Sequence, residues 1–327
     1  GVTVAIFEST QIIGVWSGLF DLPRGVAVDV GSTTVAAHLC DLATGDVLSS
    51  ASVMNPQIPF GEDLMSRVSY IMMHPEGAEA MSSAIQIALS KLFAELTDQL
   101  GEATDNILEV SLVANPIMHH LVLGINPINL GGAPFALTVD EAITLKARDI
   151  GLDTHSQARL FVLPCIAGHV GADTAGVILA ESPDSDDAMS LIVDVGTNAE
   201  IVLGNKDRLL VCSSPTGPAF EGGEISAGQR ATVGAIERVR IDRETLKPKF
   251  RVIGSELWST DSGFADSTKE LSITGICGSG IIEVVAEMFL AGIISEDGIV
   301  HGALAERSSR VRSHGRTWSY VLHFAED

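Results

Sequence analysis

Two loops of the sequence place an acid, a glycine and hydroxyl residues in the same order. Residues 26–32 read VAVDVGS and residues 191–197 read LIVDVGT. In each loop a glycine permits a tight turn, so that backbone N–H groups and hydroxyls can surround one phosphate. An aspartate at the end of the preceding strand can hold Mg²⁺ through water, because Mg²⁺ keeps several of its water ligands.

These loops predict a phosphate and metal site with parts from both halves of the chain. The expected metal-binding acids are Asp29 and Asp194. The residues expected to hold phosphates are Gly31, Ser32, Thr33 and Thr34 in the first loop, and Gly196, Thr197 and Asn198 in the second. One such loop is commonly an ordinary hairpin turn, but two copies at a domain-length distance favour a duplicated nucleotide-binding lobe.

Further acids and glycines extend this candidate site. In GHVGADTAG (residues 168–176), Gly171 opens a predicted helix where an anion could bind, yet Asp173 would repel it, so Asp173 is predicted to act beside a metal or its water. The alternative for Asp173 is an acid that the helix dipole favours. Glu200 either orients the attacking water or is a salt-bridged strand acid. With Asp29 and Asp194, these two acids complete the candidate catalytic set.

Two other glycine-rich segments are open to two interpretations. Gly217 and Gly222 in TGPAFEGG either wrap a nucleotide or form a plain loop. Gly278 and Gly280 in TGICGSG allow the backbone to approach a ligand closely, or allow a helix to pack closely.

Other side chains of possible interest have ordinary explanations. We interpret His119 and His120 as core or surface histidines and not as cobalt ligands, and Arg67 as the partner of an acid across the lobe or on another protein. The apolar or polarisable residues expected in the core are Met65, Met72, Met73, Cys40, Cys165, Cys212 and Cys277.

The predicted elements that position these residues alternate between strand and helix. Helices are expected at residues 61–74, 76–100, 116–123, 170–181 and 280–292, and strands at 34–40, 107–113, 160–165 and 199–203, with a further strand leading into each DVG loop. This order predicts an α/β fold. We expect residues 1–24 to end a preceding middle or linker domain, residues 25–185 to form the first lobe and residues 186–327 to form a second lobe that is incomplete at its C-terminus.

Charge and composition exclude several classes of protein. The 327 residues carry 20 Lys and Arg against 42 Asp and Glu, a net charge of −22 that repels nucleic acids and anionic membrane surfaces. The first residues do not resemble a signal peptide, and the longest apolar stretch contains Glu283 and Glu287. The four cysteines lack the spacing of a metal or iron–sulfur site. A cytoplasmic protein is therefore expected.

Several longer motifs carry a family resemblance: NPQIPFGEDLMSRVSY, ANPIMHHLVLGINPINL, LPCIAGHVGADTAG, DVGTNAEIVLG, GPAFEGGEISAGQRA and TGICGSGII. Together with the paired loops, they resemble the ATP-dependent reductive activators of corrinoid proteins, within the sugar kinase, heat-shock 70 and actin (ASKHA) superfamily. This resemblance implies a two-lobed actin-like ATPase with ribonuclease H-like lobes, and with ATP and Mg²⁺ in the cleft between them.

The resemblance also implies an activity and a partner. Such activators return the cob(II) corrinoid of a methyltransferase's corrinoid protein to cob(I). Their [2Fe–2S] domain and their C-terminal adenosine-side motif are expected outside this chain, so whether the chain alone is an ATPase stays open. The alternatives are a sugar or carboxylic acid kinase of the same superfamily and a binding module without nucleotide. Oligomeric state, including a homodimer, also stays open.

Overall fold

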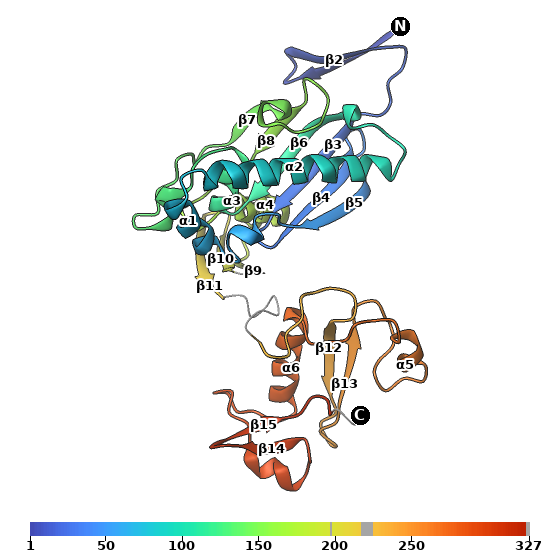
Figure 1. Ribbon diagram of the computed structural model, residues 1–327, viewed down its shortest axis with the longest axis vertical. Helices are drawn as coiled ribbons and strands as arrows, with labels where there is room; N and C mark the ends of the chain where they lie inside the picture. The colour runs from blue at the N-terminus through green and yellow to red at the C-terminus, as the bar shows by residue number, and fades with distance from the viewer. Residues whose placement is uncertain (197, 217–224, 325–327) are drawn as a thin grey trace. The chain divides into compact units, whose positions relative to one another are not determined.

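The computed structural model describes residues 1–196, 198–216 and 225–324 (Figure 1). The chain divides into two compact units. The first unit contains Gly1–Asp194 and Glu200–Ser214, and the second contains Val195–Ala199 and Pro215–Asp327.

A six-stranded mixed sheet forms the centre of the first unit. Its strand order is β5-β4-β3-β6-β8-β7, with bounds β3 (Arg24–Val30), β4 (Thr34–Asp41), β5 (Val47–Met54), β6 (Ile107–Ala114), β7 (Ile143–Lys146) and β8 (Arg159–Val162). Strands β3, β6 and β8 run parallel to one another, whereas β4, β5 and β7 are antiparallel to their neighbours. The carboxyl ends of three strands therefore meet at one edge, where α/β sheets commonly bind ligands.

Helices cover the sheet of the first unit. They are α1 (Leu64–Met73), α2 (Gly77–Asp98), α3 (Pro116–Val122) and α4 (Ala172–Glu181). The long helix α2 crosses the sheet, as Figure 1 shows, and buries Ile85, Leu89 and Phe93 on one stripe. The alternating strand residues Val26, Val28 and Val30 join the same core. Side chains point to the same face every second residue in a strand and every three to four residues in a helix. This is why these residues are buried and their neighbours are not.

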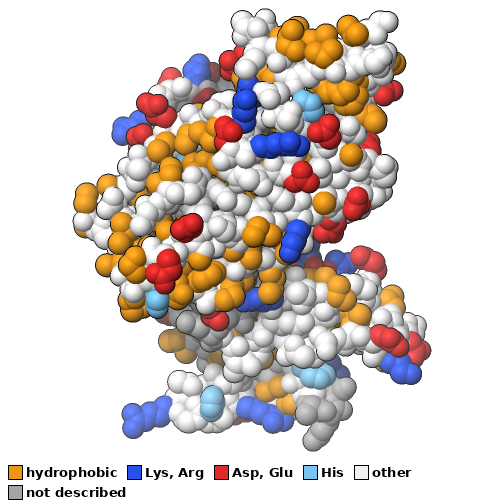
Figure 2. Space-filling view, turned by 45° about the horizontal axis from the view of Figure 1, so that its top comes forward, with side chains coloured by type: hydrophobic (Ala, Val, Ile, Leu, Met, Phe, Trp, Pro, Cys, Tyr) orange, Lys and Arg blue, Asp and Glu red, His pale blue; other side chains and the backbone are white. Residues whose placement is uncertain are grey.

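The N-terminal hairpin pairs β1 (Val2–Phe7) with β2 (Gln11–Ser17). Arg159 of β8 attaches it to the sheet: its guanidinium lies 5.4 Å from the centre of the Phe7 ring and donates to the Gln11 side chain at 2.5 Å. Hydrophobic side chains gather on the outer face of the hairpin, as Figure 2 shows; those exposed there are Val2, Val4, Ile6, Ile12 and Val15.

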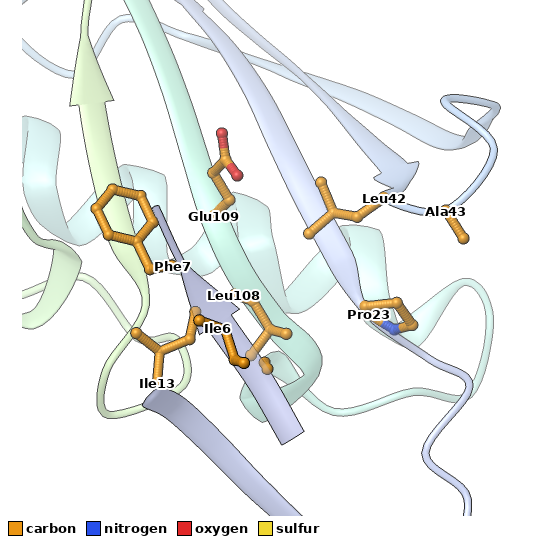
Figure 3. A pocket seen from close by; sticks show the side chains of 9 residues that line it. Ile6, Phe7, Ile13, Pro23, Leu42, Ala43, Leu108 and Glu109 are labelled. Atoms are coloured by element: carbon orange, nitrogen blue, oxygen red, sulfur yellow. The ribbon is translucent and has the colours of Figure 1, made fainter. Parts of the chain in front are cut away.

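A cavity of about 300 Å³ lies between the hairpin and the sheet (Figure 3). Its lining is apolar except for Glu109, and includes Phe7, Ile13 and Leu108. Because Leu108 lies at the start of β6, the cavity is near the amino ends of the parallel strands. It is therefore not the predicted phosphate site, which lies at their carboxyl ends.

The second DVG loop belongs to a three-stranded sheet of order β11-β10-β9, with β9 (Ser190–Val195), β10 (Asn198–Asn205) and β11 (Arg208–Pro215). The first loop likewise belongs to three strands in sequence order, β3 to β5. The predicted strands at both loops are therefore confirmed.

The second unit contains β12 (Ile236–Ile241), β13 (Pro248–Val252), α5 (Phe264–Ser267), α6 (Gly278–Leu290), β14 (Val311–His314) and β15 (Thr317–Tyr320). Helix α6 packs on β12 at Gly280, where an added Cβ would lie 2.4 Å from the Ile236 carbonyl oxygen. Glu283 and Glu287 of α6 accept hydrogen bonds from the N–H groups of Val239 and Ile241. The helix thereby covers an edge of this small sheet.

Some expectations for the core are wrong. Met65, Met72 and Met73 are exposed, because α1 turns Arg67, Val68 and Ile71 inward instead. Among the cysteines, Cys165 and Cys277 are buried, Cys40 is half-buried and Cys212 is exposed. Strands β7 and β14 and the short helix α5 were not predicted. In the described parts of the chain, no helix is long and apolar enough to cross a membrane.

A buried arginine fixes the amino end of β3. Arg24 donates to Asp41 at 2.7 Å and to both oxygens of Glu102 at 2.9 and 2.8 Å, and only 6 % of its side chain is exposed. The Arg24 guanidinium lowers the pKa of Glu102. This triad connects β3, the end of β4 and the segment after α2.

We predict that Arg24→Met lowers the free energy of unfolding by roughly 3 kcal/mol at pH 7, because two carboxylates lose their shared cation. The loss should shrink as the pH falls below about 4, since Glu102 has its lowered pKa only in the folded protein. Denaturant unfolding at both pH values measures it. The matched control is Lys206→Met, which breaks the exposed ion pair with Asp187. It should change stability by less than about 0.5 kcal/mol, and equal losses in both variants would contradict the account.

Candidate functional site

Asp29 lies near the carboxyl end of β3, directly before the first glycine loop. In that loop, the Gly31 N–H donates to the Thr34 carbonyl at 3.0 Å. A Cβ added at Gly31 would lie only 2.7 Å from the same oxygen. The tight turn expected from the sequence therefore exists, and it requires glycine at this position.

Two buried residues, Asn55 and Arg67, donate hydrogen bonds to the carbonyls of the loop. The side-chain amide of Asn55 donates to the Gly31 carbonyl at 2.8 Å, and the backbone N–H of Asn55 donates to the Thr33 carbonyl at 2.8 Å. Arg67 of α1 donates to the Ser32 carbonyl. In a trans peptide the N–H points away from the C=O, so the N–H groups of Ser32 and Thr33 face away from these donors.

Arg67 also contacts other parts of the first unit. Its other hydrogen bonds go to the Gly61 carbonyl, to Gln57 and to the Met118 sulfur, and the residue is fully buried. Within the first unit it therefore holds main-chain oxygens of the segments around the first loop. Asn55 was not identified from the sequence as a positioning residue, although the Asn–Pro step that follows β5 was a usable signal.

Asp173 is brought to this edge by the start of α4. Gly171 is the residue before the helix, and a Cβ there would lie 2.6 Å from both the Ala114 carbonyl oxygen and the Asn115 Cα. Ala114 pairs with Val30 across β6 and β3, so the start of α4 lies beside the end of β3. Asp173 itself accepts a hydrogen bond from the Thr174 N–H at 2.7 Å.

Asp194 and Glu200 complete the acidic cluster of the first unit. Asp194 lies near the end of β9, and Glu200 on β10 accepts a hydrogen bond from the Ser213 hydroxyl of β11 at 3.0 Å. The charge of Asp194 raises the pKa of the other three acids. The structure therefore brings together Asp29, Asp173, Asp194 and Glu200, the four acids singled out from the sequence.

Burial and like charge act together on these acids. Asp29 as a whole residue is exposed, but its carboxyl group is partly shielded from water. This burial is the largest cause that raises the pKa of Asp29 to about 6, and the charges of Asp173 and Asp194 raise it further. Burial likewise raises the pKa of Asp173 and of Glu200. A cation among these groups would remove the repulsion that raises them.

The donor set suits a hydrated cation. Among the described residues, no three His, Cys, Asp or Glu side chains gather closely enough to hold a metal ion directly. The acids nevertheless influence one another electrostatically. Mg²⁺ is commonly bound through one or two carboxylates and several waters, so it does not require three side chains in direct contact.

The remaining predicted residues are placed as follows. The Gly196 N–H donates to the Asn198 carbonyl at 2.9 Å, and the Thr216 hydroxyl donates to the Gly196 carbonyl at 2.6 Å. Gly278 is the first residue of α6, and Gly280 is explained by packing on β12. Thr197, Gly217 and Gly222 lie outside the described residues.

Comparisons with known proteins decide the family. The family model of the RACo middle region matches residues 24–185, and that of the C-terminal ASKHA domain of RACo matches residues 188–327. The chain belongs to the RACo family of reductive activators. Its α/β fold is accordingly that of the two-lobed ASKHA proteins, and the ASKHA domain implies nucleotide binding.

Individual relatives of this RACo-family chain are similar over most of its length. The corrinoid activation enzyme RamQ of Eubacterium limosum is 35% identical over 84% of this chain and 43% of its own length. A reductase of the Co(II) methylated amine-specific corrinoid protein from Methanosarcina barkeri is 26% identical over 83% of this chain and 52% of its own. A solved reductive activator for a corrinoid, iron–sulfur protein matches with a TM-score of 0.79 and 31% identity, over 99% of this chain and 49% of its own. The chain thus spans about half the length of these relatives.

We predict that Asp194→Asn lowers the pKa of Asp29 from about 6 toward its usual value, because one of the two charges that raise it is removed. Carbon-13 NMR titration of the Asp29 carboxyl measures the change. Asp194→Glu keeps the charge and serves as the control. An unchanged Asp29 titration in Asp194→Asn would show that these acids are not coupled.

Proposed function

We propose that this chain is the nucleotide-binding part of a reductive activator that returns the cob(II) corrinoid of a methyltransferase's corrinoid protein to cob(I). Membership of the RACo family supports this proposal, as do the corrinoid-directed names of both curated relatives. The single observation that carries it is the coupled acid cluster beside two glycine loops.

In this proposal the acid cluster binds Mg²⁺ and water, and the two glycine loops bind the phosphates of ATP. Asp29 and Asp194 hold the hydrated Mg²⁺, whose positive charge stabilises the negative charge that develops on the phosphoryl group. Asp173 and Glu200 orient the attacking water. The residues proposed to bind phosphate are Ser32, Thr33 and Thr34, with Thr197 and Asn198 of the second loop.

The electron is proposed to come from a carrier outside these residues. None of the four cysteines has a spacing that fits an iron–sulfur cluster. Burial also raises the pKa of Cys165 to about 12, which keeps its thiol protonated and a poor ligand. In this proposal the chain contributes nucleotide chemistry, and a [2Fe–2S] group elsewhere in the complete activator supplies the electron.

Nucleotide binding must be coupled to the partner for this activity. A ligand shifts a protein between conformations only by its different affinity for each of them. By linkage, Mg–ATP and the corrinoid protein then change each other's affinity by the same factor, ordinarily about 5–150-fold. We propose a cytoplasmic corrinoid protein in its cob(II) form as this partner.

We predict that Asp29→Ala and Asp194→Ala each weaken Mg–nucleotide binding by about tenfold or more, because each removes a carboxylate from one shared ion. The double variant should lose less than the product of the two effects, since both acids act on the same ion. Isothermal titration with Mg–ADP measures this. Asp46→Ala, in the turn after β4, is the control that should bind normally. Unchanged affinity in both single variants would contradict the proposal that Asp29 and Asp194 hold the metal of Mg–nucleotide.

The partner is tested by titrating the protein with a cob(II) corrinoid protein, with and without Mg–ATP. The proposal predicts different affinities in the two titrations, and the same ratio when nucleotide affinity is measured with and without the corrinoid protein. Equal affinities, combined with ATP turnover stimulated by a sugar or a carboxylic acid, would favour a kinase instead.

A further inference from the structure

Asn115 joins the carboxyl end of β6 to α3 and is the residue before the helix. Its side-chain Oδ1 accepts a hydrogen bond from the Met118 N–H at 3.0 Å, which caps the first turn of α3. Only the oxygen of a carboxamide can accept from an N–H, so this cap fixes which way the Asn115 amide is turned. The Oδ1 of Asn115 therefore faces the helix, and its Nδ2 lies on the other branch of the carboxamide.

The structure places Asn115 beside the first glycine loop. Strands β6 and β3 pair in parallel up to their final residues, so Asn115 and Gly31, the next residues of the two strands, leave the sheet side by side. The Met118 sulfur contacts the side-chain amide of Asn55, which also donates to the Gly31 carbonyl. Strand pairing and a side-chain contact thus hold the start of α3 against this loop independently of each other.

Asn115 also lies beside one acid of the cluster. A Cβ built at Gly171 would be 2.6 Å from both the Asn115 Cα and the Asp173 Oδ1, so these two atoms lie close to each other. Asn115 and Asp173 are both half-buried, which leaves them within reach of a small ligand. Asn115 is therefore adjacent to the loop proposed to bind phosphate and to an acid proposed to orient water.

The Nδ2 of Asn115 can only donate. Among the described residues, none accepts a hydrogen bond from it. An amide NH2 group offers two N–H donors and no lone pair for a cation, and the Oδ1 that could bind Mg²⁺ is engaged by the cap. The ligand of this group must therefore be an acceptor, and phosphate oxygens are strong acceptors. The nearby carboxylates repel phosphate, so a fixed neutral donor at this place favours its binding.

We propose that Asn115 is a ligand-binding residue of this site: its Nδ2 donates to a phosphate oxygen of the bound nucleotide while its Oδ1 continues to cap α3. The cap holds the carboxamide in place before the nucleotide arrives, so little side-chain freedom is lost on binding. This inference rests on the proposed function, because it requires that the site beside Asp29 bind Mg–nucleotide.

The variant Asn115→Ser tests the amide separately from the cap, since serine caps a helix about as well as asparagine but has no NH2 group. We expect its thermal unfolding to resemble that of the wild type. Its affinity for Mg–ADP, measured by isothermal titration, should fall about tenfold, because a hydrogen bond to a charged group is lost. Equal affinity of Asn115→Ser and the wild type would overturn the inference and leave the proposed function in place.

The matched control is Asn126→Ser. Asn126 is an exposed asparagine of the first unit whose side-chain oxygen likewise accepts from a backbone N–H, that of Ile128 at 3.0 Å. It is not part of the loops or the acid cluster, so Asn126→Ser should bind Mg–ADP as the wild type does. An equal loss of affinity in both variants would overturn the inference, because the effect would not be specific to Asn115.

NMR of the Asn115 side-chain NH2 group in the wild type provides a test that needs no variant. On addition of Mg–ADP, at least one of its two N–H signals should move downfield, as expected for a donor to phosphate, while the Met118 N–H signal stays in place because the cap persists. Unchanged Asn115 NH2 signals at saturating Mg–ADP would overturn the inference. Failure of the wild type to bind Mg–ADP would instead overturn the proposed function and this inference together.

Discussion

Mutual repulsion among four clustered carboxylates, which are shielded from water to different degrees, is the constraint on which the rest of this structure depends. Asp194 acts on Asp29, Asp173 and Glu200, and burial strengthens each interaction because less water screens the charges. Such a cluster destabilises a fold unless the backbone around it is held rigidly. The surrounding contacts do this, and a cation would relieve the repulsion.

The rigid support comes from neutral and cationic groups behind the loops. Asn55 and Arg67 donate hydrogen bonds to three consecutive carbonyls of the first loop. Gly171 allows the start of α4 to lie close to the end of β6. At the opposite end of β3, Arg24 ties the strand to Asp41 and Glu102. The acids therefore project from a strand fixed at both ends, and their positions change mainly through the loops and α4.

The sequence was informative where local rules decide the structure. Loop glycines, strand alternation in β3 and the repeated DVG pattern predicted the sheet around Asp29 and the four acids of the cluster. It was less informative where tertiary contacts decide. The apolar stripe of α1 was assigned to its methionines, but the helix buries Arg67, because the loop carbonyls supply hydrogen bonds that periodicity cannot reveal. The hydrogen bond that the Thr138 N–H donates to His120 likewise joins residues that are distant in sequence.

The central claim, that the acid cluster binds Mg–nucleotide, is tested most directly by counting protons released on binding. With a pKa near 6, Asp29 is half protonated at pH 6 and must ionise to hold a cation. Titration of the protein with preformed Mg–ADP, in buffers of different ionisation enthalpy, should therefore release about half a proton at pH 6 and almost none at pH 8. The release at pH 6 should disappear in Asp29→Asn. Binding without proton release at pH 6, or the same release in Asp29→Asn, would contradict the account.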